Sequence, residues 1–111
     1  MTTARFTLTM PEAFNDGAPV LLEQLALYEQ ELLDLVGGYT LTSAIGAWRA
    51  PTGDVYYEPV RKYELDIADD PAVRDELLAL ASRIALELAQ DAIYLTVAPI
   101  TKQLVSAAVP A

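Results

Sequence analysis

The residue types that most often form binding surfaces gather in one stretch near the middle of the chain, residues 48–59. The only tryptophan, two of the six tyrosines and several charged side chains lie in it or just beyond it: Trp48, Arg49, Tyr56, Tyr57, Glu58 and Arg61. Aromatic side chains together with arginine are enriched in interface hot spots, so this stretch is a candidate subunit interface or ligand surface. Alternatively, Trp48 stacks on Tyr56 across a hairpin and only stiffens it.

The absence of two residue types limits the catalytic groups that this chain can offer. The chain has no cysteine and no histidine, which excludes disulfides, thiolate nucleophiles and the usual histidine bases. An enzyme would have to use carboxylates, tyrosines, lysines or arginines, and Glu58, Arg61 and Tyr63 could serve as acid–base or oxyanion groups in a pocket between helices and sheet. Asp66, Asp69 and Asp70 resemble a metal cluster, but Asp70 fits a helix N-cap and no loop of calcium spacing surrounds them. We therefore predict no metal and no cofactor.

The net charge of the chain indicates which classes of binding partner to expect. Seven basic and sixteen acidic residues give a net charge of −9. Such a surface repels phosphate backbones and anionic lipids, so we expect neither nucleic-acid nor membrane binding. The start of the sequence lacks the pattern of a signal peptide, and the longest uncharged run is too short to span a bilayer, so we expect a cytoplasmic protein.

Two strand-like segments, Tyr39–Arg49 and Val55–Ile67, flank a five-residue stretch with strong turn chemistry, Ala50-Pro51-Thr52-Gly53-Asp54. This pattern predicts a hairpin. If Arg49 opposes Val55, then Trp48 faces Tyr56, Ser43 faces Arg61 and Leu41 faces Tyr63. In this register Arg61 lies on the core side, beside Glu58 or an acidic helix residue. An ion pair or a helix-end contact is expected there, and the alternative is an anion-binding arginine in a cleft between subunits.

The rest of the chain supplies two more strands and two helices. Alternation over Arg5–Met10 and Ala92–Ile100 predicts strands, while apolar residues at helical spacing predict helices over 20–36 and from Asp70 to about Gln90. The resulting order predicts an α+β, ferredoxin-like β-α-β-β-α-β fold, with a four-stranded antiparallel sheet and two helices on one face. Glu29, on the edge of the first helical stripe, is expected to reach outward. Tyr28, Tyr39 and Tyr63 are expected to pack at the edge of the core with their hydroxyls at its rim.

Three consequences follow from this fold. The hairpin strands are longer than the outer strands, so the hairpin should overhang the sheet. The face opposite the helices should be polar, because it carries these residues: Thr7, Thr9, Thr40, Thr42, Lys62, Glu64, Tyr94 and Thr96. We expect one domain over residues 1–111, with a core of about 5–100 and an apolar tail over 101–111 that is disordered, lies on its own sheet or packs on a neighbouring subunit.

Three short stretches, Gly46–Gly53, Glu58-Pro59-Val60 and Ala89–Leu95, resemble a group of small, uncharacterised bacterial and phage domains with a ferredoxin-like or PII-like fold. The group has a G-x-W-x-x-P-x-G hairpin, a glutamate in the returning strand and a glutamine at the exit of the second helix. The resemblance implies the same fold and a tendency to form oligomers. It marks Trp48, Glu58 and Gln90 as functional positions.

Together these observations favour a non-enzymatic domain that self-associates into a homo-oligomer and binds through its aromatic hairpin and open sheet face. Two alternatives stay open at this level. One is a small dimeric ferredoxin-like enzyme with an acid–base site at Glu58, Arg61 and Tyr63. The other is a phage or accessory protein that sequesters a small molecule or a host protein.

Overall fold

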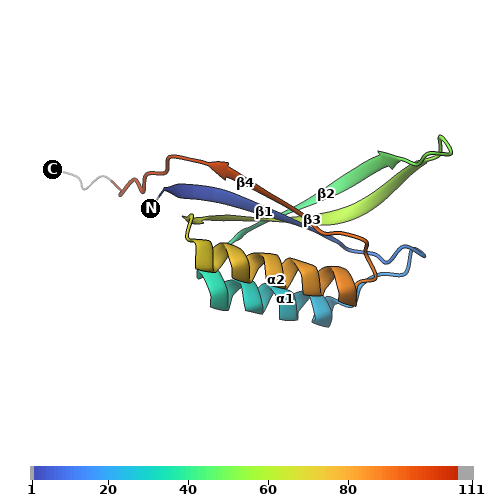
Figure 1. Cartoon of the computed structure of the whole chain (residues 1–111), viewed down its shortest axis with the longest axis horizontal. Coiled ribbons are helices and arrows are strands. Elements are labelled where there is room, and N and C mark those ends of the chain that lie inside the picture. The colour runs from blue at the N-terminus through green and yellow to red at the C-terminus, as the bar shows by residue number, and fades with distance from the viewer. Residues whose placement is uncertain (1, 108–111) are drawn as a thin grey trace.

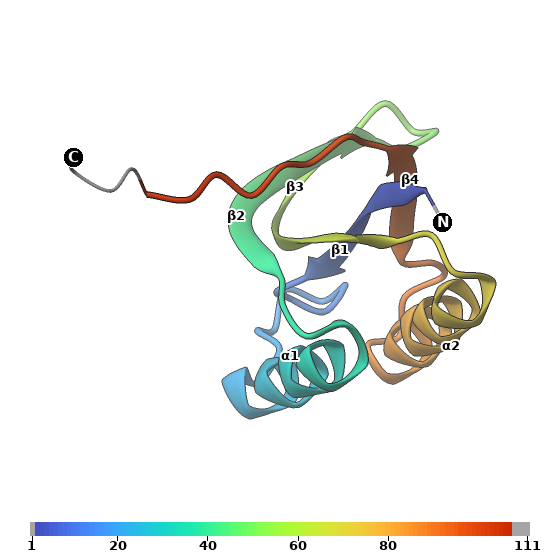
Figure 2. The ribbon, with the colours of Figure 1, turned by 90° about the vertical axis from the view of Figure 1, so that its left-hand side faces the viewer.

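The computed structural model describes residues 2–107, in which four strands and two helices follow one another in the predicted order. The elements are β1 (Thr3–Pro11), α1 (Leu22–Val36), β2 (Thr40–Arg49), β3 (Val55–Ala68), α2 (Pro71–Glu87) and β4 (Tyr94–Pro99). The strands form one antiparallel sheet in the order β2-β3-β1-β4. Figure 1 shows both helices beneath this sheet, and Figure 2, turned by 90°, shows α1 and α2 side by side. The α+β arrangement is consistent with the ferredoxin-like prediction.

Local sequence signals set the helix ends. The Asp70 carboxylate accepts a hydrogen bond from the Ala72 N–H at 2.9 Å, and Pro71 occupies the first helical position of α2. This confirms the predicted N-cap. Helix α1 ends at Gly37, whose φ of 84° lies in the left-handed region and whose N–H donates to the Leu33 carbonyl. This confirms the predicted end of the first helix at residue 36.

The hairpin has the predicted register. Arg49 pairs with Val55, Trp48 with Tyr56 and Ser43 with Arg61, and the pairing runs without a bulge to Thr40 and Glu64. The turn is closed by two backbone hydrogen bonds, from Ala50 N–H to the Asp54 carbonyl and from Gly53 N–H to the Ala50 carbonyl.

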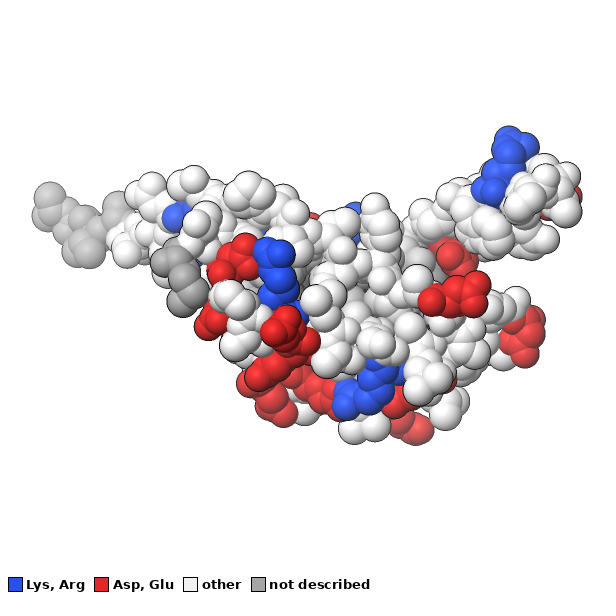
Figure 3. Space-filling model, in the orientation of Figure 1, with Lys and Arg blue, Asp and Glu red and all other residues white. Residues whose placement is uncertain are grey.

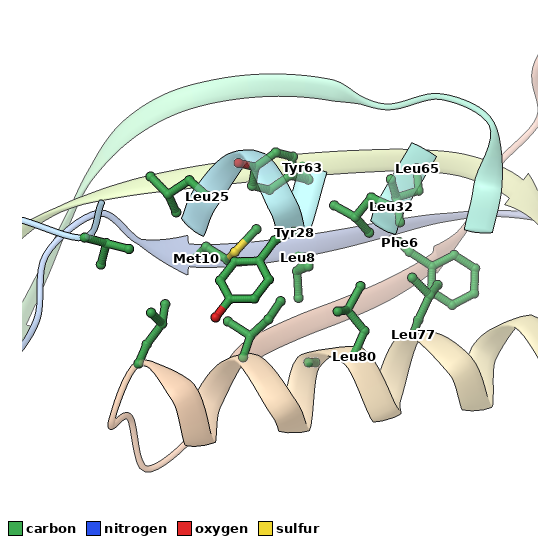
Figure 4. Close-up of a cluster of buried hydrophobic side chains, with 14 of the residues drawn as sticks. Phe6, Leu8, Met10, Leu25, Tyr28, Leu32, Tyr63, Leu65, Leu77 and Leu80 are labelled. Atoms are coloured by element: carbon green, nitrogen blue, oxygen red, sulfur yellow. The ribbon is translucent and has the colours of Figure 1, made fainter. Parts of the chain in front are cut away.

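The space between the helices and the sheet is filled by apolar side chains (Figure 4). β1 and β3 contribute a layer of fully buried residues, Phe6, Leu8, Met10, Tyr63 and Leu65. The helices cover that layer with a second set, which includes Leu25, Tyr28, Leu32, Leu77, Leu80 and Ile84. This burial provides the main stabilisation of the fold, since apolar area contributes about 25 cal/mol per Å² removed from water.

The opposite face of the sheet is polar, as the alternation predicts. Thr7 pairs with Glu64 and with Thr96, and Thr9 pairs with Lys62 and with Tyr94, so these side chains share a face across three strands. At one end of this face Arg5 donates two hydrogen bonds to Asp66, at 2.8 and 2.9 Å. The Arg5 guanidinium holds the pKa of the Asp66 carboxyl below its ordinary value.

The predicted overhang is present. β1 pairs with β3 from Thr3 opposite Ala68 to Pro11 opposite Val60, and β3 then continues to Val55 against β2 alone. Figure 1 shows this outer part of β2 and β3 rising away from the rest of the protein.

Beyond β4 the chain runs on without regular structure. The Ile100 N–H donates to the Thr3 carbonyl, and Lys102 Nζ donates to the Asp66 carbonyl at 3.1 Å, but residues 101–107 are exposed. The end of the predicted tail, residues 108–111, lies outside the described residues. No helix of residues 2–107 is long and apolar enough to cross a membrane.

The two adjacent glycines after α1 give a test of the helix stop. An added Cβ meets no atom within 4 Å at either glycine, but only Gly37 has a positive φ. We predict that Gly37→Ala lowers the free energy of unfolding by about 1 kcal/mol, because a left-handed conformation is costly for alanine. Gly38→Ala is the matched control and should leave stability unchanged or slightly raised. Urea denaturation measures both, and equal effects of the two substitutions would contradict the assignment.

Candidate functional site

A cleft of about 770 Å³ lies where the overhanging hairpin leaves the body of the protein. We call it the hairpin cleft. Three segments that are far apart in the sequence line it: the loop after β1, the outer part of the hairpin and the loop after α2. The lining residues are Ala13, Phe14, Asn15, Gly17, Trp48, Tyr56, Tyr57, Glu58, Pro59, Gln90, Asp91 and Ala92. Its volume falls within the range of small-molecule sites, about 300–1,000 Å³.

Aromatic side chains form the hairpin wall of the cleft. The rings of Trp48 and Tyr56 stack with centroids 4.9 Å apart and planes inclined by 22°. Both side chains are about half exposed, so the stack keeps surface available to another molecule. The stacking interpretation of the hairpin is therefore correct, and the same pair still lines a cleft. Tyr57, the next residue along β3, is largely exposed and also borders the cleft.

The loop after β1 forms the facing wall and is held by its own hydrogen bonds. The Phe14 N–H donates to the Ala18 carbonyl at 2.7 Å, and the Gly17 N–H donates back to the Phe14 carbonyl at 2.9 Å. The Ala18 N–H also donates to the Asp16 carboxylate. Gly17 has a φ of 89°, which favours glycine. Phe14 and Asn15 are thus presented on a closed turn rather than on a loose loop.

Asn15 ties this turn to the loop after α2. Its Nδ2 donates to the Ala89 carbonyl at 3.3 Å, and its Oδ1 accepts from Gln90 Nε2 at 3.1 Å. Ala89 has a φ of 53°, and the Gln90 N–H donates to the Ala85 carbonyl, which is the hydrogen-bond pattern of a Schellman cap. Alanine in this conformation carries backbone strain, and the Asn15 contact helps to hold it. Two walls of the cleft are therefore fixed relative to each other.

The lining of the cleft is acidic. Glu58 and Asp91 supply carboxylates, and no lysine or arginine belongs to the lining set. Figure 3 shows acidic surface where the hairpin joins the body and on the body below it. The cleft thus offers aromatic faces and negative charge, which suits a cation and disfavours a phosphate.

A polar cluster beneath the sheet fixes the base of the hairpin. Arg61 donates from Nε to Glu12 and from Nη1 to Glu29, both at 2.9 Å, and Tyr39 Oη donates to Glu29 at 2.7 Å. This confirms that Arg61 pairs with an acidic helix residue. The expectation that Glu29 reaches outward is wrong, because its carboxylate is drawn under the sheet edge by these two donors.

Tyr63 lies deepest in this region. Its ring is fully buried, and its hydroxyl meets neither Arg61 nor Glu29 at hydrogen-bonding geometry. Burial raises the pKa of Tyr63 to about 12. The predicted rim position holds for Tyr28 and Tyr39, whose hydroxyls bond Glu87 and Glu29, but not for Tyr63.

The candidate acid–base trio does not converge. Glu58 lies in the cleft, whereas Arg61 and Tyr63 lie on the helix side of β3, because odd and even residues of a strand point to opposite faces. Arg61 is already engaged by two carboxylates, and the helix–sheet interface is filled. The pocket between helices and sheet that this interpretation needs is occupied by the core.

Five of the residues singled out in the sequence line the cleft, namely Trp48, Tyr56, Tyr57, Glu58 and Gln90. The two arginines do not: Arg49 donates to the Gly53 carbonyl in its own turn, and Arg61 serves the polar cluster. Sequence reasoning missed Phe14, Asn15 and Asp91. The Asn15-Asp16-Gly17 turn and the Gln90-Asp91 helix exit were visible signals, but nothing in the sequence joins them.

The acidic residues around the start of α2 have separate partners. Asp66 binds Arg5, Asp69 binds Arg74, and Asp70 caps α2. Within residues 2–107, no group of three or more acidic side chains is placed so that it could hold a metal ion.

Comparison with known proteins finds a likeness in structure alone. No protein family matches the sequence, and no curated protein matches it significantly. Among solved structures, the chain is similar to a phage SAM lyase in complex with S-methyl-5'-thioadenosine, with a TM-score of 0.66. The likeness covers 88% of this chain and 81% of the lyase at 7% sequence identity. At this identity it shows a shared fold.

The unpartnered hydroxyl of Tyr63 gives a sharp prediction. The pKa of Tyr63 is raised from 10 to about 12 by folding, so its contribution to stability is complete below pH 10 and is lost as the pH rises through 12. We predict that Tyr63→Phe leaves the free energy of unfolding at pH 7 unchanged or higher, because it removes an unsatisfied polar group. It should also reduce the loss of stability between pH 10 and 12. A residual loss is expected, since folding also raises the pKa values of Tyr28 and Tyr39.

Tyr39→Phe is the matched control, because it removes a hydroxyl that does have a partner. It should lower the free energy of unfolding by about 1 kcal/mol at pH 7. Denaturant titrations at pH 7 and pH 11 make the comparison. A large loss at pH 7 from Tyr63→Phe would show that this hydroxyl is engaged after all.

Proposed function

We propose that this domain binds a small organic molecule in the hairpin cleft, and that the ligand combines a flat aromatic ring with a positive charge. The observation that carries this proposal is the meeting of a half-exposed aromatic stack with two carboxylates, Glu58 and Asp91, in a cleft whose lining includes no basic side chain. This interpretation keeps the predicted binding role of the hairpin and specifies the chemistry of its ligand.

The aromatic side chains of the cleft are the reason for proposing a flat ring in the ligand. Trp48, Tyr56 and Tyr57 present apolar faces, and Phe14 does so from the facing loop. A planar ligand ring inserted against these faces would gain about 0.5–1.5 kcal/mol per aromatic contact beyond simple area burial. The hydrogen bonds between Asn15, Ala89 and Gln90 hold the walls in place, so less ordering accompanies binding.

The acidic lining of the cleft is the reason for proposing a positive charge on the ligand. A cation near Glu58 is attracted both by the carboxylate and by the faces of the neighbouring rings. Nucleotides carry phosphates, and the net charge of −9 together with the acidic cleft opposes their binding. The proposed ligand is therefore a ring-bearing cation rather than a nucleotide.

The structural neighbour supports one compound class. Its ligand, S-methyl-5'-thioadenosine, contains a flat purine and a sulfur atom, and the name of that enzyme refers to SAM, whose sulfonium is a cation. Adenosyl sulfonium compounds therefore satisfy both requirements of the cleft. The structural likeness guides the choice of an adenosyl sulfonium compound as the probe. The residues proposed to bind it are those that line the cleft.

The single tryptophan provides a local readout of binding. Trp48 lines the cleft, so its fluorescence should change in a saturable way when S-adenosylmethionine is added. We expect a smaller affinity for neutral S-methyl-5'-thioadenosine and at least a tenfold weaker effect of ATP. No saturable change with any of the three, or tightest binding of ATP, would refute the proposal.

A substitution tests the charge contact. Glu58→Gln should raise the Kd for S-adenosylmethionine by about fivefold, which corresponds to about 1 kcal/mol for a partly exposed charge pair. The Kd for the neutral thioether should change by less than about twofold. Glu76→Gln, the same substitution on the exposed surface of α2 and outside the cleft lining, is the control and should change neither. If Glu58→Gln raised the Kd of both ligands equally, Glu58 would not recognise the positive charge, and the proposal of a cationic ligand would be contradicted.

We also propose that the domain self-associates through the hairpin, as the sequence led us to expect. The observation in favour is the exposure of large apolar side chains along the hairpin, where Ile45 is 70% exposed, Tyr57 74% and Val55 42%. Contiguous exposed apolar surface often marks a protein interface.

Light scattering coupled to size exclusion measures this directly. We expect a mass above that of one chain at about 100 µM, and Ile45→Lys should shift it toward the monomer. Leu86→Lys replaces a side chain that is 81% exposed on α2 and should leave the mass unchanged. A monomeric wild-type protein at this concentration would contradict self-association.

A further inference from the structure

The overhanging part of β3 has a free strand edge on the cleft side. The Pro59 carbonyl on that side accepts from the Glu12 N–H at 3.0 Å, which shows that odd residues of this stretch direct their backbone groups away from β2. β1 ends opposite Val60, so the N–H and C=O groups of Val55 and Tyr57 meet no strand on that side within residues 2–107. Pro59 has no N–H and its carbonyl is already bonded, so the free edge, as we call it, is Val55–Tyr57. Unpaired edges of this kind are templates for another strand.

The chain also carries a segment that lacks a partner. After Ile100 bonds the Thr3 carbonyl, residues 101–107 take part in no backbone hydrogen bond within the described chain. We call residues 100–107 the C-terminal extension. Leu104 is 94% exposed and Val105 is 84% exposed, and Lys102 is the one charged residue of the extension. The exposed apolar side chains of this segment leave area that can be buried against another surface.

These two features cannot meet within one molecule. The protein is 62 Å long, and Figure 1 shows the C-terminal extension leaving one end of the long axis while the hairpin projects from the other. A contact between them must therefore join two copies.

We propose that the C-terminal extension of one copy pairs as an added strand with the free edge of a second copy. This inference rests on the proposed self-association and names the surfaces that produce it. The extension is long enough, because a free edge of three residues spans about 10 Å and an extension of eight residues can cover about 26 Å. Strand addition of this kind draws its affinity from backbone hydrogen bonds.

Charge favours this occupant over a second hairpin. Asp54 and Glu58 flank the free edge, and Asp91 lies across the cleft, so two hairpins placed edge to edge would bring carboxylates together. The extension brings no carboxylate over residues 100–107 and carries Lys102. Because different surfaces meet, the contact is heterologous and generates a ring or an open chain of subunits. The inserted strand would also form a further wall of the hairpin cleft.

The test uses one substitution on each side of the contact. Leu104→Asp places a charge on the extension at a position with no contacts to lose, and Leu86→Asp, on an equally exposed leucine of α2, is its control. Tyr57→Pro removes a backbone N–H that points away from β2, so the hairpin can form while the free edge loses a donor. Tyr57→Ala keeps that N–H and controls for the loss of the ring.

Light scattering at about 100 µM should show wild type, Leu86→Asp and Tyr57→Ala above the monomer mass, and Leu104→Asp and Tyr57→Pro at it. Mixing Leu104→Asp with Tyr57→Pro should then give a species of two chains, since the first variant has an intact free edge and the second an intact extension. Circular dichroism confirms that both are folded.

The outcomes separate the two proposals. A monomeric wild type overturns self-association and this inference together. A wild-type assembly that Leu104→Asp leaves intact overturns only the inference. A mixture of the folded variants that stays monomeric would show that the contact does not join the extension to the free edge.

Discussion

The difference in length between β1 and β3 is the constraint on which the hairpin cleft depends. β1 loses its pairing at Pro11, opposite Val60, while β3 continues to Val55 against β2 alone. The end of the hairpin is thus left without a neighbour on one side, and the loops after β1 and α2 turn back beneath it. The same length difference produces an aromatic wall, a free backbone edge and a concave surface.

Such an overhang is useful only if its direction is fixed, and Arg61 does this. It stands next to Val60, where the β1 pairing ends, and bonds Glu12 in the chain just after β1 and Glu29 on α1. One guanidinium therefore joins both neighbours of the hairpin base. Charge-assisted hydrogen bonds in a partly buried site are stronger than neutral ones, so this cluster resists bending of the hairpin. On the other side of the cleft, Asn15 and Gln90 hold the two loops together.

Patterns close together in the sequence were predictable, and contacts between distant loops were not. The hairpin register follows from the Ala50–Asp54 turn and the alternation beside it, and the ends of the helices follow from Asp70 and Gly37. The aromatic wall could be anticipated because Trp48 and Tyr56 lie opposite each other across that turn. Asn15 meeting Ala89 could not, since it depends on how the helices bring two loops together and on an alanine with a positive φ. The prediction for Glu29 was wrong for a similar reason. Helical periodicity places Glu29 at the edge of the apolar stripe, but only the fold shows that Arg61 lies close enough to bind its carboxylate.

The central claim is that the three segments around the hairpin cleft act as one binding site for a ring-bearing cation. An NMR titration of ¹⁵N-labelled protein with S-adenosylmethionine tests it most directly, because each segment reports separately. We expect saturable shifts in residues 13–17, 56–58 and 90–92 and in the Trp48 indole, with a common Kd. Shifts confined to the polar sheet face around Thr7 and Thr96, or spread over the helices without saturation, would contradict it.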